Sequence, residues 1–430
     1  MDREKRQLNS RRREGQSQTQ KQMQLLKIGL GVTLGVTLVC CFIMLAAVNG
    51  WLKFHPAPAT TEPVVESQPE TEPAPTEPPV PDQVIHLIAG GDVNVTDKTV
   101  AAGLNGSGYD YTNVFMDVLP TLAGGDLTML NFEGSLYGAP YSKKSAPQEL
   151  VQALQRAGVD ILQTANSRCV ERGFTGLRAT LNGIRSAGMI AAGTFADQTE
   201  RDKSRGYTLL EVAGIKIAVV AFTKGMDDLV YIEKDEEYCV NLLYKDYYTT
   251  HQGTIFQKIN TDGIKSVLGA VREAKPDVTV ALVHWGSTDN DTISKTQKQI
   301  CSLMLEEGVD AIIGSHSHRV QQMVFDEAAG TFVAYSLGDF MGDGEDVAAY
   351  SVLLDLQITK SAETGKVKIT GFDYVPIYQY WEGESLRVMR IEEAVEAYEC
   401  NAIGRVTEEV YQKMKTALTD ISKRISAKVP

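Results

Sequence analysis

The chain has 430 residues, enough for two or three ordinary domains, and its 43% hydrophobic content excludes a chain that is disordered throughout. Six cysteines are too few for a disulfide scaffold, and a net charge of −13 argues against a protein that grips nucleic acid by bulk charge. The charge is uneven, because residues 1–27 carry eight Lys/Arg against three Asp/Glu. A basic N-terminal segment followed by an acidic remainder suggests that the two parts lie in different compartments.

Residues 28–48 read IGLGVTLGVTLVCCFIMLAAV, a run of 21 residues without a charge. At about 1.5 Å per residue, a helix of this length spans roughly 30 Å, the hydrocarbon thickness of a bilayer. The basic residues 1–27 precede this run, which predicts a cytoplasmic tail and an extracytoplasmic remainder. The long basic region and the lack of a nearby small-x-small cleavage site favour an uncleaved anchor over a signal peptide. We therefore expect a single-pass protein of the cell membrane.

Residues 49–82 are expected to form a linker. Within them, residues 56–82 hold nine of the chain's fifteen prolines and five glutamates. Such a composition cannot build a hydrophobic core and favours an extended polyproline II conformation. We interpret this segment as a stalk between the membrane helix and a globular domain.

From Val84 onward, short apolar runs alternate with amphipathic stretches, which predicts an α/β fold with buried, largely parallel strands. Residues 347–359 and 366–379 predict an antiparallel pair of strands. We assign residues 83–380 to this domain and residues 381–430 to a C-terminal helical extension. The other predicted strands lie at 84–92, 127–134, 160–166, 216–222, 278–286, 310–318 and 332–340, and the predicted helices lie at 146–157, 178–187, 262–274 and 295–307.

Polar residues stand where the predicted strands end. In open α/β sheets, ligands bind outside the carboxyl ends of the strands, and converging oxygen and imidazole groups are typical of a divalent metal site. For each residue alone, a capped loop or a buried, hydrogen-bonded histidine remains an alternative. Three of the six histidines directly follow apolar runs, which favours a metal or anion site. The candidate metal ligands are Asp92, Asn131, Glu133, His284, His316 and His318.

Five short motifs follow one another in a distinctive order, and this order resembles the CapA family of bacterial capsule or poly-γ-glutamate synthesis proteins. The resemblance covers about Val84 to Val375 and implies a calcineurin-like metallophosphatase fold, a layered sheet with flanking helices. It also implies a divalent metal of the Mn, Fe or Zn class at the candidate ligands. The motifs are GGD (Gly90–Asp92), NFEG (Asn131–Gly134), HWG (His284–Gly286), GSHSH (Gly314–His318) and YSLGDF (Tyr335–Phe340).

The third motif of that family departs here from its usual form, Asn-Asn-His followed three residues later by Asp. This chain has Asn166, Ser167 and Arg168, followed by Glu171. The resemblance implies that the second Asn is normally a metal ligand and that the His protonates a leaving group or steadies charge. An arginine stays protonated at any working pH, although it can pair with a phosphate or carboxylate.

From the resemblance we assign catalytic roles to Asp92 and Arg168. We assign binding roles to Asn166, Glu171 and Arg319. The assignments of Asp92, Arg168, Asn166 and Glu171 carry family roles onto matching positions of this chain. Arg319 is assigned for a different reason, because an acidic domain would have to bind a polyanion through local basic side chains.

Two functions remain open from the sequence. In the first, a metal-dependent hydrolase activates water to attack a phosphoester or an amide of an envelope polymer, with Arg168 clamping an anionic group. In the second, the altered third motif leaves a degenerate metal site that binds an anionic envelope polymer or a membrane protein of capsule synthesis. The loss of the Asn-His pair favours the second. No nucleic-acid partner is expected.

Overall fold

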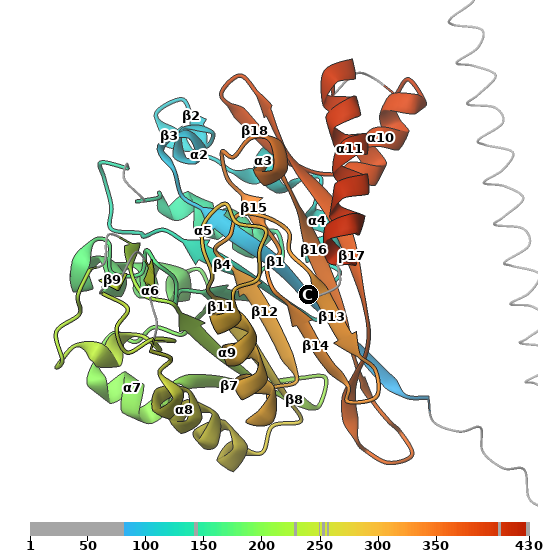
Figure 1. Cartoon of the computed structure of the whole chain (residues 1–430). Coiled ribbons are helices and arrows are strands. Elements are labelled where there is room, and N and C mark those ends of the chain that lie inside the picture. Colours follow the sequence, from blue (N-terminus) through green and yellow to red (C-terminus); the bar gives the residue numbers. More distant parts are fainter. Residues whose placement is uncertain are drawn as a thin grey trace, which may run out of the picture. The chain divides into compact units, whose positions relative to one another are not determined.

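The structure is a computed structural model that describes residues 81–426, apart from 142–144, 228–229, 249, 252–253, 256–257 and 403–405. The predicted tail, membrane helix and nearly all of the predicted linker lie outside these residues. Among the described residues, no helix is both long and apolar enough to cross a membrane. Figure 1 shows the described part, whose layers are built from two β-sheets and the helices around them.

The first sheet combines a parallel half with an antiparallel meander (Figure 1). Its strand order is β18-β17-β16-β1-β4-β5-β6, and β15 also pairs with β1 in parallel. The antiparallel pairing of β16 with β17 confirms the predicted hairpin. The strands are β1 (Gln83–Asn94), β4 (Leu127–Glu133), β5 (Ile161–Gln163), β6 (Ile190–Ala192), β15 (Asp339–Met341), β16 (Tyr350–Lys360), β17 (Val367–Glu382) and β18 (Ser385–Arg390).

The second sheet has six strands in the order β13-β14-β12-β11-β8-β7. Its centre, β8, β11, β12 and β14, is parallel, and an antiparallel strand lies at each edge. The strands are β7 (Tyr207–Val212), β8 (Ile215–Thr223), β11 (Val278–His284), β12 (Ala311–Ser315), β13 (Met323–Asp326) and β14 (Thr331–Ala334).

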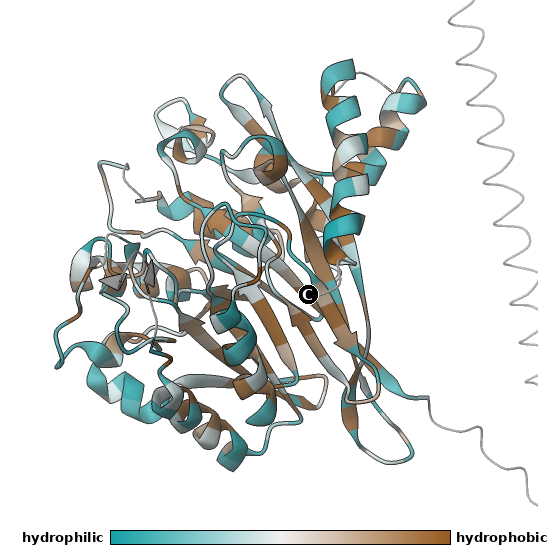
Figure 2. Ribbon diagram, in the orientation of Figure 1, coloured by the Kyte–Doolittle hydropathy of each residue, from teal (hydrophilic) through white to brown (hydrophobic). Residues whose placement is uncertain are grey.

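Helices cover the sheets through apolar stripes. The flanking helices α5 (Gln148–Arg156), α6 (Gly173–Ser186), α8 (Thr261–Ala274) and α9 (Lys295–Glu306) match the four predicted ones. In Figure 2 their outward faces are largely hydrophilic, whereas the strands they cover are hydrophobic. The remaining elements are α2 (Asp97–Ala101), β2 (Leu104–Asn105), β3 (Gly108–Tyr109), α3 (Thr112–Phe115), α4 (Leu119–Leu122), α7 (Gln198–Ser204), η2 (Glu237–Cys239), β9 (Thr250–His251), β10 (Thr254–Ile255), η3 (Asp346–Ala348), α10 (Ile391–Glu399) and α11 (Glu408–Ile425).

Alternation along β1 shows how the two faces of the first sheet are used. Ile85 and Leu87 belong to a core that they share with Val280 of β11, so this face packs against the second sheet. Ile88 points to the opposite face and belongs to a second core, which includes Leu150 of α5. The predicted mixed α/β fold with parallel strands is therefore confirmed, and its central layer consists of two sheets packed on each other.

The predicted strand 332–340 is wrong as a single element. It forms β14 in the second sheet and β15 in the first, so the chain crosses between the sheets within this segment. Gly338 has φ 81°, a left-handed conformation that breaks the strand. Asp339 therefore begins β15 instead of ending a strand.

Candidate metal centre

The carboxyl ends of parallel strands from both sheets meet at one site. In the first sheet, Asp92 of β1 lies in register with Asn131 of β4 and with Asp339 of β15. In the second sheet, His284 is the last residue of β11 and lies in register with Ser315 at the end of β12. All five residues are buried. The predicted convergence of carboxyl ends therefore places these side chains together, except for Asp339, which joins them from the first position of β15.

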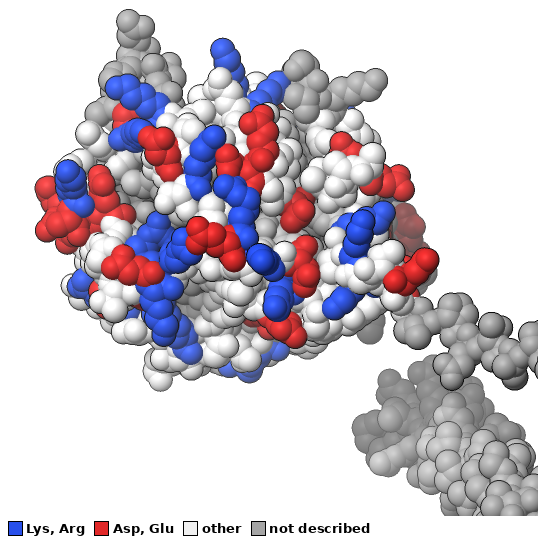
Figure 3. Space-filling view, turned by 90° about the horizontal axis from the view of Figure 1, so that it is seen from below, with Lys and Arg blue, Asp and Glu red and all other residues white. Residues whose placement is uncertain are grey.

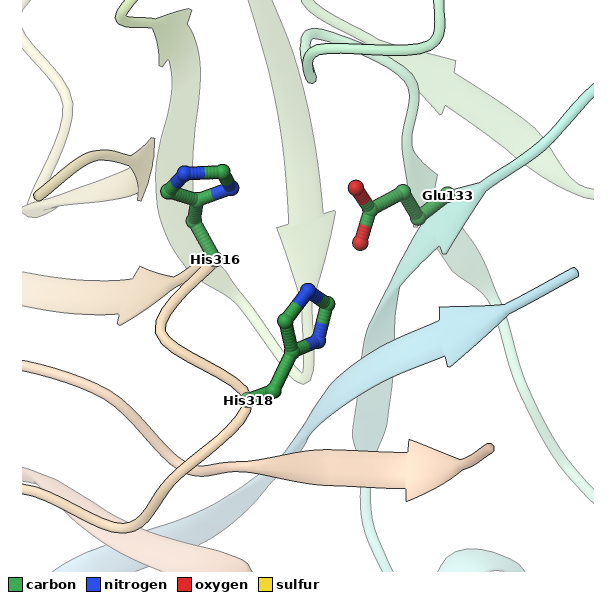
Figure 4. A group of neighbouring side chains, drawn as sticks. All are labelled: Glu133, His316 and His318. Atoms are coloured by element: carbon green, nitrogen blue, oxygen red, sulfur yellow. The ribbon is translucent and has the colours of Figure 1, made fainter. Parts of the chain in front are cut away.

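The loop after β12 supplies two more histidines. His316 has φ 93° and His318 has φ 57°, conformations that residues other than glycine rarely adopt. The backbone N–H of His316 donates to Asp92 Oδ2 at 3.0 Å, which joins this loop of the second sheet to a strand of the first. The unusual backbone turns both imidazoles toward the same place (Figure 4).

The structure brings together two groups of potential ligands. Glu133, His316 and His318 form one group, and Asp92, His318 and Asp339 form the other, with ligand atoms within 4.8 Å of one another in each. His318 is shared by both groups. Figure 4 shows the first, in which Glu133 from β4 faces the two histidines of the loop. A third imidazole approaches as well, because His284 Nε2 lies 3.8 Å from Glu133 Oε1.

Buried atoms without partners indicate that this donor set fits a cation. Glu133 Oε2, His284 Nε2 and His316 Nδ1 have no hydrogen-bond partner among the described residues. Leaving such groups unpaired in a protein interior is costly, so each one calls for an explanation such as an ion. On His284 the other ring nitrogen, Nδ1, lies 3.1 Å from Ser315 Oγ, which orients the ring as outer hydrogen bonds do for metal-ligating histidines.

The carboxyl groups of the site hold their protons unusually strongly. Burial, aided by the nearby charge of Asp339, raises the pKa of Asp92 to about 6. Burial and the charge of Asp92 raise the pKa of Glu133 to about 7. Burial also raises the pKa of Asp339. Three buried carboxyl groups at one place repel one another as anions, and a divalent cation would relieve that repulsion.

The histidines divide into two kinds. Burial lowers the pKa of both His284 and His316 well below the usual value, so both stay neutral and able to ligate a metal. Burial acts to lower the pKa of His318 too, but its contact with Asp339 and the charges of Glu133 and Asp92 raise it to about 10. The Nδ1 atom of His318 lies 2.6 Å from Asp339 Oδ1.

Asn131 in β4 and Asn166 in the loop after β5 form hydrogen bonds beside the ligand groups. Asn131 Nδ2 donates to Asp92 Oδ1 at 2.5 Å, and Asn166 Nδ2 donates to Asn131 Oδ1 at 3.1 Å and to the Phe132 carbonyl at 2.7 Å. The Asn166 side chain also accepts from the Arg168 backbone N–H at 3.0 Å. The Asn166 side chain is therefore used in fixing the loop after β5. Its neighbour Ser167 donates to Glu133 Oε1 at 3.2 Å.

Arg168 lies among three carboxylates. Its guanidinium contacts Asp227 at 2.8 Å, Glu171 at 3.3 Å and Glu133 at 3.8 Å. The structure thus brings Arg168 and Glu171 to the edge of the ligand cluster. With three acidic partners, this guanidinium acts first as an internal counter-ion.

Arg319 lies outside both ligand groups in the part of the chain that the structure describes. It directly follows His318, yet its guanidinium points to a neighbouring loop, with Nε 3.7 Å from Asp289 and Nη1 3.6 Å from Asp291.

Three residues that belong here are not among the predicted site residues. Asp339 is the acidic residue of the YSLGDF motif and lies near the end of the predicted strand 332–340. Lys224 and Asp227 follow the strand β8, so the rule that polar residues gather after strands could have found them. Asp227 pairs with Arg168, and half-buried Lys224 acts on the electrostatics of Glu133 and His284.

Residues 86–344 match the model of a protein family described as bacterial capsule synthesis protein PGA_cap, more than half of the chain. The chain belongs to this family. The resemblance to CapA proteins is thereby confirmed, and the matched region includes every candidate ligand.

Two relatives bear out the same membership. The capsule biosynthesis protein CapA of Bacillus anthracis is 25% identical over 265 residues, which cover 59% of this chain and 58% of that protein. The PGA biosynthesis protein CapA of Bacillus subtilis (strain 168) is 24% identical over 276 residues, which cover 61% of this chain and 65% of that protein. The chain thus spans about three fifths of the length of these relatives.

Solved structures show a more distant likeness. A phosphatase from Mycoplasma pneumoniae is 13% identical with a TM-score of 0.44, and the match covers 69% of this chain and 94% of that chain. The calcineurin-like phosphoesterase YfkN from Bacillus subtilis is 14% identical with a TM-score of 0.43, and the match covers 79% of this chain and 98% of that chain. TM-scores below 0.5 are too low to carry an argument about function.

Proposed function

We propose that this chain is a membrane-anchored, extracytoplasmic protein that acts in the synthesis of capsule, poly-γ-glutamate or a related anionic envelope polymer. We further propose that its metallophosphatase-like metal site serves in binding or assembly and not in hydrolysis. Family membership supports the polymer class. The apolar run 28–48 and the basic residues before it support the anchor and its orientation. The single observation that carries the non-hydrolytic role is the placement of Arg168.

The residues that would hold a divalent metal are those of the two ligand groups, together with His284. Mixed imidazole and carboxylate donors suit Mn, Fe or Zn. When bound, such an ion supplies positive charge that polarises water or attracts an anionic group. The unpartnered atoms of Glu133, His284 and His316 support this assignment.

The third motif of this chain forms structural hydrogen bonds and ion pairs, whereas the family pattern has a metal ligand and a proton donor at these positions. The family pattern has a histidine where this chain has Arg168, and an arginine is not a general acid. Ser167 is engaged with Glu133, and Asn166 with Asn131 and Phe132. General acid–base assistance is typically worth roughly 10²–10⁴ in rate, so its loss favours a site that binds more than it cleaves.

The charge distribution supports a local mode of polymer binding. The chain carries −13 overall, and basic and acidic side chains are interspersed on the face drawn in Figure 3. Arg168 and Arg319 already face carboxylates. The positive charge that an anionic polymer meets at this site would therefore come from a bound cation.

The test uses the full-length chain in detergent with Mn²⁺, poly-γ-glutamate and a model phosphodiester. We expect metal-dependent binding of poly-γ-glutamate and little or no cleavage of either compound. The variant His318→Ala should lose this binding, because His318 belongs to both ligand groups. The matched control is His86→Ala. His86 is a half-exposed residue of β1 that pairs with Asp355, and its variant should bind poly-γ-glutamate like the wild type. Robust cleavage by the wild type would contradict the proposal.

A second candidate, an active metal-dependent hydrolase, is favoured by the two groups of imidazole and carboxylate donors. The double variant Ser167→Asn/Arg168→His separates the two. If the site is degenerate, restoring the family pattern should raise phosphodiester cleavage. If Arg168 stabilises charge in an active hydrolase, the wild type should cleave well and Arg168→His should lower the rate.

A further inference from the structure

The loop that carries His316 and His318 is held by a second loop, residues 287–293. The backbone N–H of Asp289 donates to the Ser317 carbonyl at 3.0 Å, and Thr288 Oγ1 lies 3.4 Å from His316 Nε2. Gln321 Nε2 donates to the Asn290 carbonyl at 2.7 Å. The position of the two histidines therefore depends on where the loop 287–293 lies.

Both loops contain residues in unfavourable backbone conformations. Asp289, with φ 53°, joins His316 and His318 as a non-glycine residue with positive φ. Such conformations persist only where surrounding contacts fix them, and they are common at functional sites. The loop 287–293 should therefore depend on contacts with other parts of the chain.

The C-terminal helix α11 supplies one of these contacts. Arg424 of α11 donates from Nη1 to Asp291 Oδ1 at 2.5 Å. The same oxygen lies 3.6 Å from Nη1 of Arg319, the residue directly after His318. One carboxylate thus links α11 to the histidine loop.

Arg424 is itself firmly seated. It also contacts Asp420 one turn earlier, and Asp420 accepts from the Tyr350 hydroxyl of β16. Only 16% of the Arg424 side chain is exposed, against 52% of Asp291. In Figure 1, α11 lies along β16 and β17. Through Asp420 and Arg424, the helix therefore connects Tyr350 of the first sheet to Asp291 in the loop 287–293.

We propose that Arg424, acting through Asp291, is a positioning residue for the metal site. This inference rests on the proposed metal centre. Without Arg424, the loop 287–293 loses its tie to α11, and the two histidines are held less firmly although every ligand remains. Arg424 lies in α11, beyond the residues 86–344 that match the family, whereas Asp291 and the loop that it holds lie within them.

The experiment titrates Co²⁺ into the full-length chain in detergent and records affinity and the visible absorption of the bound ion. Arg424→Ala and Asp291→Asn should each weaken Co²⁺ binding about two- to five-fold, the size expected when a partly exposed ion pair is lost, and should alter the absorption bands. The double variant should be no worse than either single one. Arg424→Lys should restore part of the affinity.

The matched control is Lys415→Ala, which removes another α11 cation whose partners are Glu399 and Tyr411. It should leave Co²⁺ affinity and absorption unchanged. If Arg424→Ala and Asp291→Asn bind like the wild type, or if Lys415→Ala has the same effect as they do, the positioning role is overturned while the metal centre stands. If the wild type binds no Co²⁺, the metal centre itself is overturned, and the positioning role with it.

Discussion

At the residue scale, the carboxyl groups of Asp92 and Glu133 show what burial does to acidic side chains. Both lie at strand ends that no solvent reaches, and burial raises their pKa values to about 6 and about 7. Removing a carboxylate from water is expensive unless positive charge compensates it. Here His318, held protonated mainly by Asp339 and also by Glu133 and Asp92, provides that charge, and a divalent metal would provide more.

These pKa values predict how metal affinity depends on pH. A cation must displace the protons on Asp92 and Glu133, so Mn²⁺ affinity should rise as the pH increases from about 5 to about 7.5. His318, with a pKa of about 10, still carries a proton at the upper end. Calorimetry in two buffers should therefore find about three protons released per Mn²⁺ near pH 5 and about one near pH 7.5. Affinity that falls or stays constant over this range would contradict the account.

At the scale of elements, glycines let the strands β1 and β15 approach closely at the site. A Cβ atom on Gly91 would lie 1.7 Å from the carbonyl oxygen of Gly338, the same oxygen that accepts from the Asp92 backbone N–H at 3.1 Å. The glycine therefore sets the distance between the two strands that carry Asp92 and Asp339. This explains the glycine before Asp92 in the GGD motif.

Gly91→Ala should consequently destabilise the domain, because the clash is with backbone and not with a movable side chain. We expect a loss of about 1–3 kcal/mol in the free energy of unfolding, the usual cost of overpacking. Urea unfolding of the variant measures it. Gly108→Ala, in the short strand β3 with open space around its Cβ, is the matched control and should change stability little. Equal effects of the two substitutions would rule out the close approach as the cause.

A comparison of predicted and observed elements shows which parts of the fold can be predicted from the sequence. Apolar runs located most strands and the four flanking helices. The rule that ligands gather after parallel strands located every member of the two candidate ligand groups except Asp339. Hydrophobic periodicity carries no information on which sheet a strand joins, so the crossing at Gly338 was missed. Likewise, the carboxylates around Arg168 come from different segments of the chain. Only the folded structure shows that this arginine pairs with acidic side chains of the protein itself, and not simply with an anionic ligand.

At the scale of the whole molecule, orientation across the membrane follows from the charges beside the apolar run 28–48. We predict that residues 52–430 lie outside the cytoplasm. Protease added to intact protoplasts should remove the globular domain while a cytoplasmic marker survives. A domain that resists protease under these conditions, yet is digested after lysis, would show that the orientation is wrong.

The proline-rich segment 56–82 is predicted to contribute nothing to the stability of the domain, since a chain of this composition buries no core. Deleting it should leave the midpoint of thermal unfolding unchanged within experimental error. The comparison requires the full chain and the deletion variant in the same detergent. A clear drop in the midpoint would mean that the segment packs on the domain.

We propose that residues from both sheets form a divalent metal centre, and the metal content of the purified chain shows whether they do. The full-length chain, saturated with Mn²⁺, Fe²⁺ or Zn²⁺ and freed of excess ion, should retain about one metal per chain. His316→Ala should reduce this amount, and His318→Ala should reduce it most, because His318 belongs to both ligand groups. Both variants should keep the fold, as judged by circular dichroism. A wild type that retains no metal, or variants that retain as much as the wild type, would contradict the account.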